Sequence, residues 1–160
     1  MKKIFITFLV LAMGVFAIPS FAHAGNQFNN DSRDLDTVMV ANDTQNPCTS
    51  GGVDGCWRNS VDAEPGDVIS VMVYYHNTSG SIANTVALGM NPRNSSASTT
   101  HTFEGGVLVY GWPDALGSAS VHLSESATLN FIPGSVRWFP NQTLSGQSIS
   151  NEGNLFGNYG

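Results

Sequence analysis

The chain has 160 residues, of which 41% are hydrophobic and 11% are charged, and it carries a formal net charge of −6 at pH 7. Because only six Lys and Arg stand against twelve Asp and Glu, no basic surface is available to neutralise phosphates. The composition therefore excludes nucleic-acid binding, and the length suits one domain.

The first 24 residues have the pattern of a bacterial secretory signal peptide. Two lysines precede an apolar run at 4–18, and a small-residue motif ends at Ala24. We expect cleavage between Ala24 and Gly25, which leaves 136 residues with four Arg against twelve acidic residues, a formal charge of −8. The alternative is an uncleaved membrane anchor, because about 20 apolar residues can span a bilayer. The pattern favours a secreted or cell-surface protein with no membrane span after cleavage.

Residues 25–35 form a polar segment before the first expected strand, at 35–41. Oxygen-bearing side chains cluster near the end of this segment: Asn30, Asp31, Asp34 and Asp36. Calcium prefers such oxygens, but their spacing does not match an EF-hand loop. Asn and Asp are also ordinary turn formers, and a turn is the interpretation we favour. We therefore expect neither a metal nor a cofactor.

Cys48 and Cys56 are the two cysteines of the chain. In a secreted protein an even count indicates a disulfide. Three glycines among the seven intervening residues let this short loop turn back on itself. Two thiols with no His or Cys at ligand spacing are too few for zinc, and the spacing is not that of a Cys-x-x-Cys redox motif. We predict a structural disulfide.

The clearest strand pattern lies at 65–92. The run 67–76 alternates between two faces, and the face expected to point inward carries Ile69, Val71, Val73 and Tyr75. A turn leads to a second run, 82–90, which ends before Pro92. The two runs predict a pair of strands in a β-sandwich.

The same stretch carries a family resemblance. A Pro-Gly-Asp opening at 65–67, an alternating strand, an Asn-containing turn and a second strand ending in Pro follow one another. This succession resembles the immunoglobulin-like repeat domains of bacterial cell-surface proteins, and the resemblance extends over residues 36–139. It implies an immunoglobulin-like antiparallel β-sandwich that acts as an extracellular structural or adhesive module, and it identifies no ligand.

The rest of the chain continues with strands separated by turn residues. We expect strands at 102–110, 118–124 and 136–138, with a bulge or bend where Gly105 and Gly106 interrupt the first of them. No window after residue 25 combines a cap with helical apolar spacing. The predicted fold class is therefore all-β.

Residues 140–160 are rich in Gly, Asn, Ser and Gln, and only 154–159 reads as the start of a further strand. Two interpretations stay open. The sequence is a fragment cut before its last strand, or another copy supplies the missing strand, as in pili assembled by strand donation. The donor would then be 25–35, although its polar make-up is a poor match for an apolar groove.

Catalytic motifs are missing from the sequence. His76, His101 and His122 each lie in or beside an expected strand among Ser and Thr. Glu104 and Glu125 could be imagined as paired glycosidase carboxylates, but acidic residues this sparse are far more often solvated surface. With no nucleophile elbow, His-Glu-x-x-His pair or phosphate-binding glycine loop, we predict that the protein is not an enzyme.

Aromatic residues offer the main alternative function, a carbohydrate-binding module. Most aromatics should belong to the core, because a sandwich needs large residues on its inner faces. Trp57 and Trp112 are the better ligand candidates, since each lies near Gly or Pro in a loop context. A flat row of aromatics on an outer face would favour the module, whereas an apolar groove with a missing strand would favour a polymer.

The function predicted first is a structural or adhesive subunit of the cell surface, self-assembling into a filament by strand donation. Its partners would be other copies of itself or cell-surface components, with a carbohydrate as the alternative.

Overall fold

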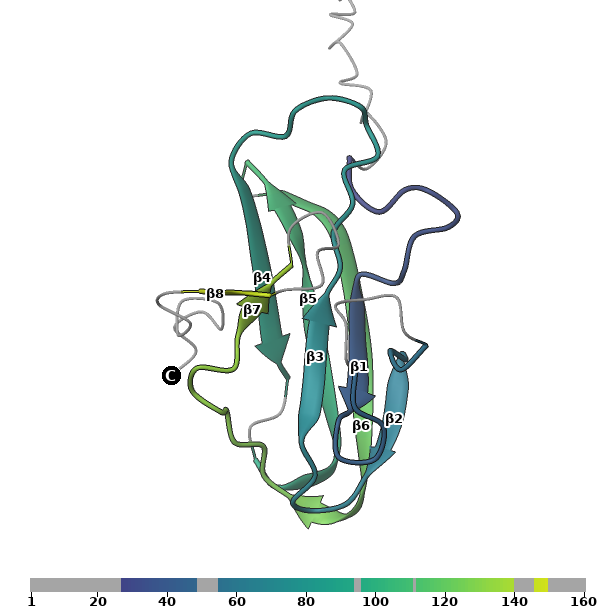
Figure 1. The fold of residues 1–160 in the computed structure, drawn as a ribbon, viewed down its shortest axis with the longest axis vertical. Helices are drawn as coiled ribbons and strands as arrows, with labels where there is room; N and C mark the ends of the chain where they lie inside the picture. The colour runs from purple at the N-terminus through teal and green to yellow at the C-terminus, as the bar shows by residue number, and fades with distance from the viewer. Residues whose placement is uncertain (1–26, 49–54, 94–95, 111, 140–145, 150–160) are drawn as a thin grey trace, which may run out of the picture.

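The computed structural model describes residues 27–48, 55–93, 96–110, 112–139 and 146–149 (Figure 1). The described part is all-β, as the sequence predicts, and none of it forms a helix able to cross a membrane. The signal pattern, with Ala24 and Gly25, lies outside these ranges. The strands are β1 Val38–Asn42, β2 Ser60–Ala63, β3 Ile69–Val73, β4 Val86–Pro92, β5 Ser98–Val109, β6 Trp112–Ala127, β7 Arg137–Trp138 and β8 Gln147–Ser148.

Two sheets face each other in the manner of a sandwich (Figure 1). The larger sheet has the order β2-β6-β5-β4, in which β2 runs parallel to β6 and the other pairs are antiparallel. The smaller sheet consists of β1 and β3, paired antiparallel with Val38 opposite Val73. A short hairpin of β7 and β8 forms a third, separate sheet.

The centre of the larger sheet is the long hairpin of β5 and β6. Val109 pairs with Trp112 across a two-residue connection, in which Tyr110 has a φ of 55°. Positive φ is what the favoured two-residue hairpin turns require, because their twist matches that of the strands. The hairpin thus brings together the inward faces of its two strands along most of their length.

Two apolar clusters fill the space between the sheets. The larger one is built from buried side chains of β1, β2, β5 and β6: Val38, Val40, Ala63, Phe103, Ala119 and Val121. The smaller one lies under the N-terminal end of the described chain and contains Phe28, Val107 and Ala115. Inward-pointing residues of β3 and β4 pack only partly against these clusters.

Glycines let β1 approach the larger sheet closely. Gly105 and Gly117 lie opposite each other in β5 and β6. A Cβ at Gly117 would lie 2.9 Å from the Val38 nitrogen of β1. A Cβ at Gly105 would lie 3.3 Å from the Val38 side chain and 2.7 Å from the Gly89 oxygen of β4, its neighbour in the same sheet. Any side chain at either position would therefore force backbone apart.

The bulge predicted at Gly105 and Gly106 is not where the structure has one. The pairing is regular at Gly105 and Gly106, so the expected bulge there is wrong, and one register shift of the hairpin falls between Val107 and Leu108 instead. A glycine pair in a strand fits a bulge and a close backbone contact equally well by pattern. In this chain the glycines serve the close backbone contact.

The other strand predictions are confirmed with shifted ends. The runs at 67–76 and 82–90 contain β3 and β4, but these two strands belong to different sheets and do not pair with each other. The short strand β2 was not predicted, and neither was β8, which lies in the segment expected to be a polar tail.

Candidate functional site

The predicted disulfide is confirmed. Cys48 and Cys56 are bonded, with Cα atoms 5.8 Å apart, and Cys56 is buried. The residues that follow return the chain to β1, where Arg58 and Val40 exchange backbone hydrogen bonds of 2.9 and 2.8 Å. The disulfide therefore closes a loop beside the edge of β1 that faces away from β3.

The two sides of the sandwich differ in how well they are closed. All five residues of β1 are buried, whereas every residue of β3 is only partly buried and β4 has no buried residue. We call the region between β3 and β4 the open side; its inward apolar side chains are Val71, Val73, Leu88 and Met90. Within the described ranges, β3 pairs with β1 alone and β4 with β5 alone.

The hydrogen-bond register identifies the backbone groups on the free edge of β3. Tyr74, just after the strand, donates its N–H to the Thr37 oxygen on the β1 side at 2.8 Å. Backbone groups alternate between the two edges of a strand, so the N–H groups of alternate residues point away from β1. These residues are Ile69, Val71 and Val73.

The free edge of β4 differs from that of β3. Arg93 donates its N–H to the Thr102 oxygen of β5 at 2.8 Å, so the nitrogen of the preceding Pro92 faces the free edge. Proline has no N–H to offer there, a common way of blunting an edge strand. The β3 edge is therefore the better place for an added strand.

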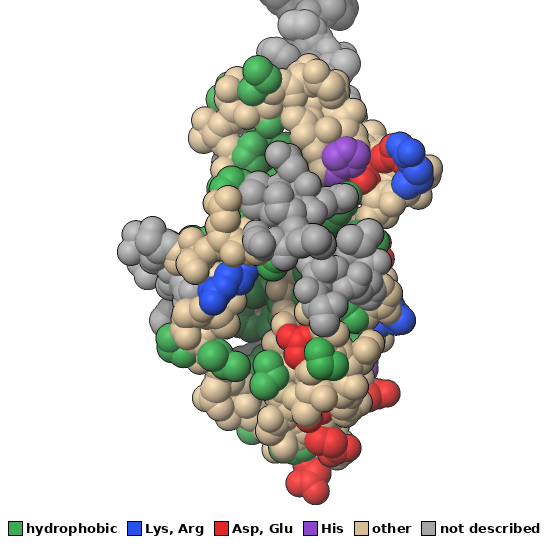
Figure 2. Space-filling view, in the orientation of Figure 1, with side chains coloured by type: hydrophobic (Ala, Val, Ile, Leu, Met, Phe, Trp, Pro, Cys, Tyr) green, Lys and Arg blue, Asp and Glu red, His purple; other side chains and the backbone are tan. Residues whose placement is uncertain are grey.

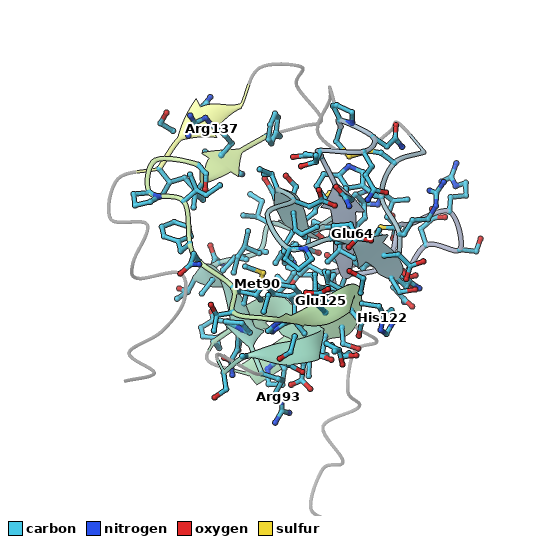
Figure 3. The ribbon with its side chains drawn as sticks, turned by 90° about the horizontal axis from the view of Figure 1, so that it is seen from below. Glu64, Met90, Arg93, His122, Glu125 and Arg137 are labelled. Atoms are coloured by element: carbon cyan, nitrogen blue, oxygen red, sulfur yellow. A yellow bond between two sulfur atoms is a disulfide. The ribbon has the colours of Figure 1, made fainter. Side chains whose placement is uncertain are left out.

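The open side is visible as a hollow. Figure 2 shows apolar side chains at its floor, between β3 and the β7–β8 hairpin. In Figure 3, Met90 projects from β4 into this space, and Arg137 lies across it on the hairpin. Phe131 and Ile132, in the segment between β6 and β7, are 48% and 52% exposed. Among the described residues, apolar side chains of the interior are thus partly exposed on this side.

Beyond the end of β3, on the edge that faces β1, the chain's own residues 27–29 are docked as an added strand. Asn29 donates its N–H to the His76 oxygen at 2.9 Å, and Thr78 donates to the Gln27 oxygen at 2.8 Å, so Phe28 lies opposite Asn77. We call residues 27–29 the N-terminal segment. It extends the β1–β3 sheet beyond the end of β3.

The site that receives this segment, which we call the N-terminal dock, combines a carboxylate with an apolar pocket. Asp114 accepts the N–H of Gln27 at 3.0 Å on one oxygen and the N–H of Phe28 at 2.6 Å on the other. The Phe28 side chain is only 3% exposed. It lies in the cluster with Val107 and Ala115, against which further residues pack: Tyr75, Ala83, Leu88 and Val109.

A polar network ties the segment and its connection to the end of β3. Asn29 donates its side-chain N–H groups to Tyr74 O at 2.9 Å and Thr37 Oγ1 at 3.0 Å. Asp34 lies 2.7 Å from His76 Nδ1 and accepts the Tyr74 hydroxyl at 3.2 Å. Burial raises the pKa of the Asp34 carboxyl, but hydrogen bonds from the Asp31 N–H, His76 and Tyr74 outweigh burial and lower it.

The connection between the segment and β1 is held to the sandwich mainly by the polar contacts of Asp34. No residue from Asn30 to Asp36 is buried. Beneath it lies a polar hollow of about 370 Å³, lined by this connection, by Asn59 and by β6 at Leu116–Ser118. Polar groups therefore line most of the space between the connection and the domain.

The acidic residues predicted to form a turn do so. Asp34 donates its N–H to the Asp31 oxygen at 2.9 Å, and Asp31 forms an ion pair with Arg33 at 2.6 Å. Hydrogen bonds from Arg33 hold the pKa of the Asp31 carboxyl well below its usual range. The described residues contain no group of three or more His, Cys, Asp or Glu side chains placed to hold a metal.

The titratable residues considered for catalysis are scattered. His101 is fully buried, and its Nε2 lies 2.8 Å from the Ala127 oxygen, a core position. Glu104 forms an ion pair with Arg93 at 2.6 Å. His122 and Glu125 lie at the lower end of the larger sheet (Figure 3), where the His122 ring is 3.4 Å from the Thr100 hydroxyl.

Of the two aromatic candidates, the structure describes the side chain of Trp57 alone. Trp57 is partly buried, and its indole N–H is covered without a hydrogen-bond partner in the described ranges. Trp112 begins β6, but its side chain is outside the described part. The exposed aromatics are spread over a hairpin turn, a connection and a short strand: Tyr110, Phe131 and Trp138.

Comparison with protein-family models, with curated proteins and with solved structures finds no match for this chain.

Proposed function

We propose that this protein is a secreted structural or adhesive subunit of the bacterial cell surface, built on an immunoglobulin-like sandwich and joined to other copies by strand addition. The observation that carries the proposal is the open side. N–H groups on β3 that no described strand pairs with, and half-exposed apolar side chains behind them, are what an incoming extended segment pairs with in β-strand addition. The disulfide fits an oxidising compartment.

The alternative, a carbohydrate-binding module, has less support. Such sites stack sugars on aromatic rings, and the exposed aromatics Tyr110, Phe131 and Trp138 come from three separate elements. A β3 edge that no described strand pairs with instead favours a polymer.

Negative-stain microscopy of the natively exported protein tests the proposal. We expect filaments or chains of copies from the wild type. Val73→Pro removes one N–H of the free β3 edge without removing a hydrogen bond to β1, so it should abolish assembly and leave the domain folded. Met72→Pro is the matched control, because it breaks a β1–β3 hydrogen bond and should destabilise the domain. A wild type that stays monomeric at high concentration would rule out the proposal.

Export has its own test. Both lysines of the chain lie at positions 2 and 3, so a protein cleaved after Ala24 carries one primary amine, the new terminus at Gly25. An amine-reactive reagent should therefore add one label per exported chain. Three labels per chain would mean that the leader stays attached.

A further inference from the structure

The N-terminal dock has the elements of a peptide-binding site. It offers two carboxylate oxygens of Asp114 to consecutive backbone N–H groups, a short β-pairing with Asn77 and its neighbours, and a pocket for one aromatic side chain. Backbone pairing gives such sites affinity, and a pocket for an alternate side chain gives them specificity. The peptide seen in the dock is the chain's own.

The peptide is attached through a connection held to the sandwich mainly by polar contacts. Between Phe28 and Thr37 no residue is buried, and the connection spans the polar hollow above Leu116–Ser118. Straightening it exposes one half-buried apolar side chain, Leu35, and separates Asp34 from His76 and Tyr74. The turn bonds between Asp31 and Asp34 would be lost, and water can replace them because this loop is polar and largely exposed.

We propose that residues 27–29 are exchanged between copies, so that Phe28 of one copy fills the N-terminal dock of another. Exchange keeps every contact of the docked segment, because donor and acceptor have the same sequence, and this is why swapped elements join copies at low cost. This inference takes one point from the proposed function, namely that copies of the protein associate. It adds a joint separate from the free edge of β3.

A second copy is the occupant that the geometry identifies. The pocket holds a Phe side chain at 3% exposure, and the two Asp114 hydrogen bonds are set at the positions of Gln27 and Phe28. The sequence that satisfies all of these contacts at once is the segment already in the dock.

Cross-linking between two tagged chains tests the exchange. Gln27 lies opposite Thr78 in the pairing, at a spacing within the range of a disulfide. Chains carrying Gln27→Cys and chains carrying Thr78→Cys, each with the native disulfide intact, are mixed and oxidised mildly. We expect a disulfide that joins two chains carrying different tags. Gln27→Cys mixed with Ser126→Cys, an exposed position on β6, is the control and should give none.

Phe28→Ala sharpens the test because its effect should change sign with the chain that carries it. In the donor chain, it weakens the incoming segment and should lower the cross-linked fraction by about tenfold or more, since burying a Phe side chain is worth more than a factor of ten in an equilibrium constant. In the acceptor chain, it weakens the resident segment, vacates the dock and should raise the fraction. A mere folding defect would lower both.

The outcomes separate this inference from the proposed function. The absence of a disulfide between chains, when Gln27→Cys/Thr78→Cys in one chain forms it internally, would overturn the exchange. Filaments that persist in that case would leave the proposed function standing. A cross-link that also forms in the Val73→Pro background would support exchange as an independent joint, and its loss there would contradict that independence.

Discussion

The β1 side and the open side of this sandwich have similar strands but different closure. Both β1 and β3 are five residues long and mainly apolar, yet all of β1 is buried and none of β3 is. The difference follows from neighbours, because β1 is paired on both edges and lies against glycines of β5 and β6, while β3 has one paired edge in the described part. Burial in a sheet is set by what lies beside a strand as much as by its sequence.

The largest expected effect comes from placing a charge on each side. Val40→Asp buries an unpaired carboxylate at a position with 0% exposure, which should cost several kcal/mol and unfold a domain whose total stability is about 5–15 kcal/mol. Val73→Asp, on partly buried β3, should cost about 1–3 kcal/mol. Urea unfolding measures both. Equal losses would mean that the open side is closed in solution.

Removal of the disulfide should weaken the β1 side next. Cys48→Ala/Cys56→Ala frees a short loop, and the chain-entropy estimate for such a loop is about 2–3 kcal/mol. Thermal unfolding of this variant should match that of reduced wild type. An unchanged midpoint would show that the loop does not support the edge of β1.

Ser70 gives a smaller effect on the outer face of β3. Its hydroxyl donates to the Asp43 carboxylate, so Ser70→Asp sets two carboxylates against each other and should cost about 1 kcal/mol. The alternation of side chains along the strand, taken alone, predicts that position 70 is exposed and tolerates the change. Added salt should restore part of the unfolding free energy that Ser70→Asp loses, and none of what Ser70→Ala loses. A Ser70→Asp variant as stable as the wild type would contradict the Asp43 contact.

The smallest effect is a pH dependence at the N-terminal dock. The pKa of Asp34 is lowered in the folded state, so its contribution to stability is present above the unfolded pKa of about 4 and is lost as the pH falls through the lower folded value. Asp34→Asn should remove that part of the acid dependence. Unfolding midpoints from pH 6 to pH 2 measure it, and identical acid slopes for both proteins would contradict the Asp34 contacts.

Local pattern predicted the all-β class, the inward face of β3 and the disulfide, because period-two alternation and paired cysteines are local signals. It missed β2, whose sequence Ser-Val-Asp-Ala is polar and which pairs with β6, some sixty residues later. It also missed Phe28, one aromatic in a polar segment, whose burial depends on residues of β4, β5 and β6. Long-range pairing decides such positions, and a single sequence does not display it.

The glycine contact between β1 and β6 has a consequence for synthesis. Thr37 and Val38 come early in the chain, but they pack against Gly117, so the first strand has no place to bury itself until β6 has been made. The β5–β6 hairpin, whose partners are close in sequence, can form by itself, and contacts between distant segments follow more slowly. The nascent chain therefore stays without a sandwich until its last third emerges. Until then, the chain can still be threaded through a membrane channel.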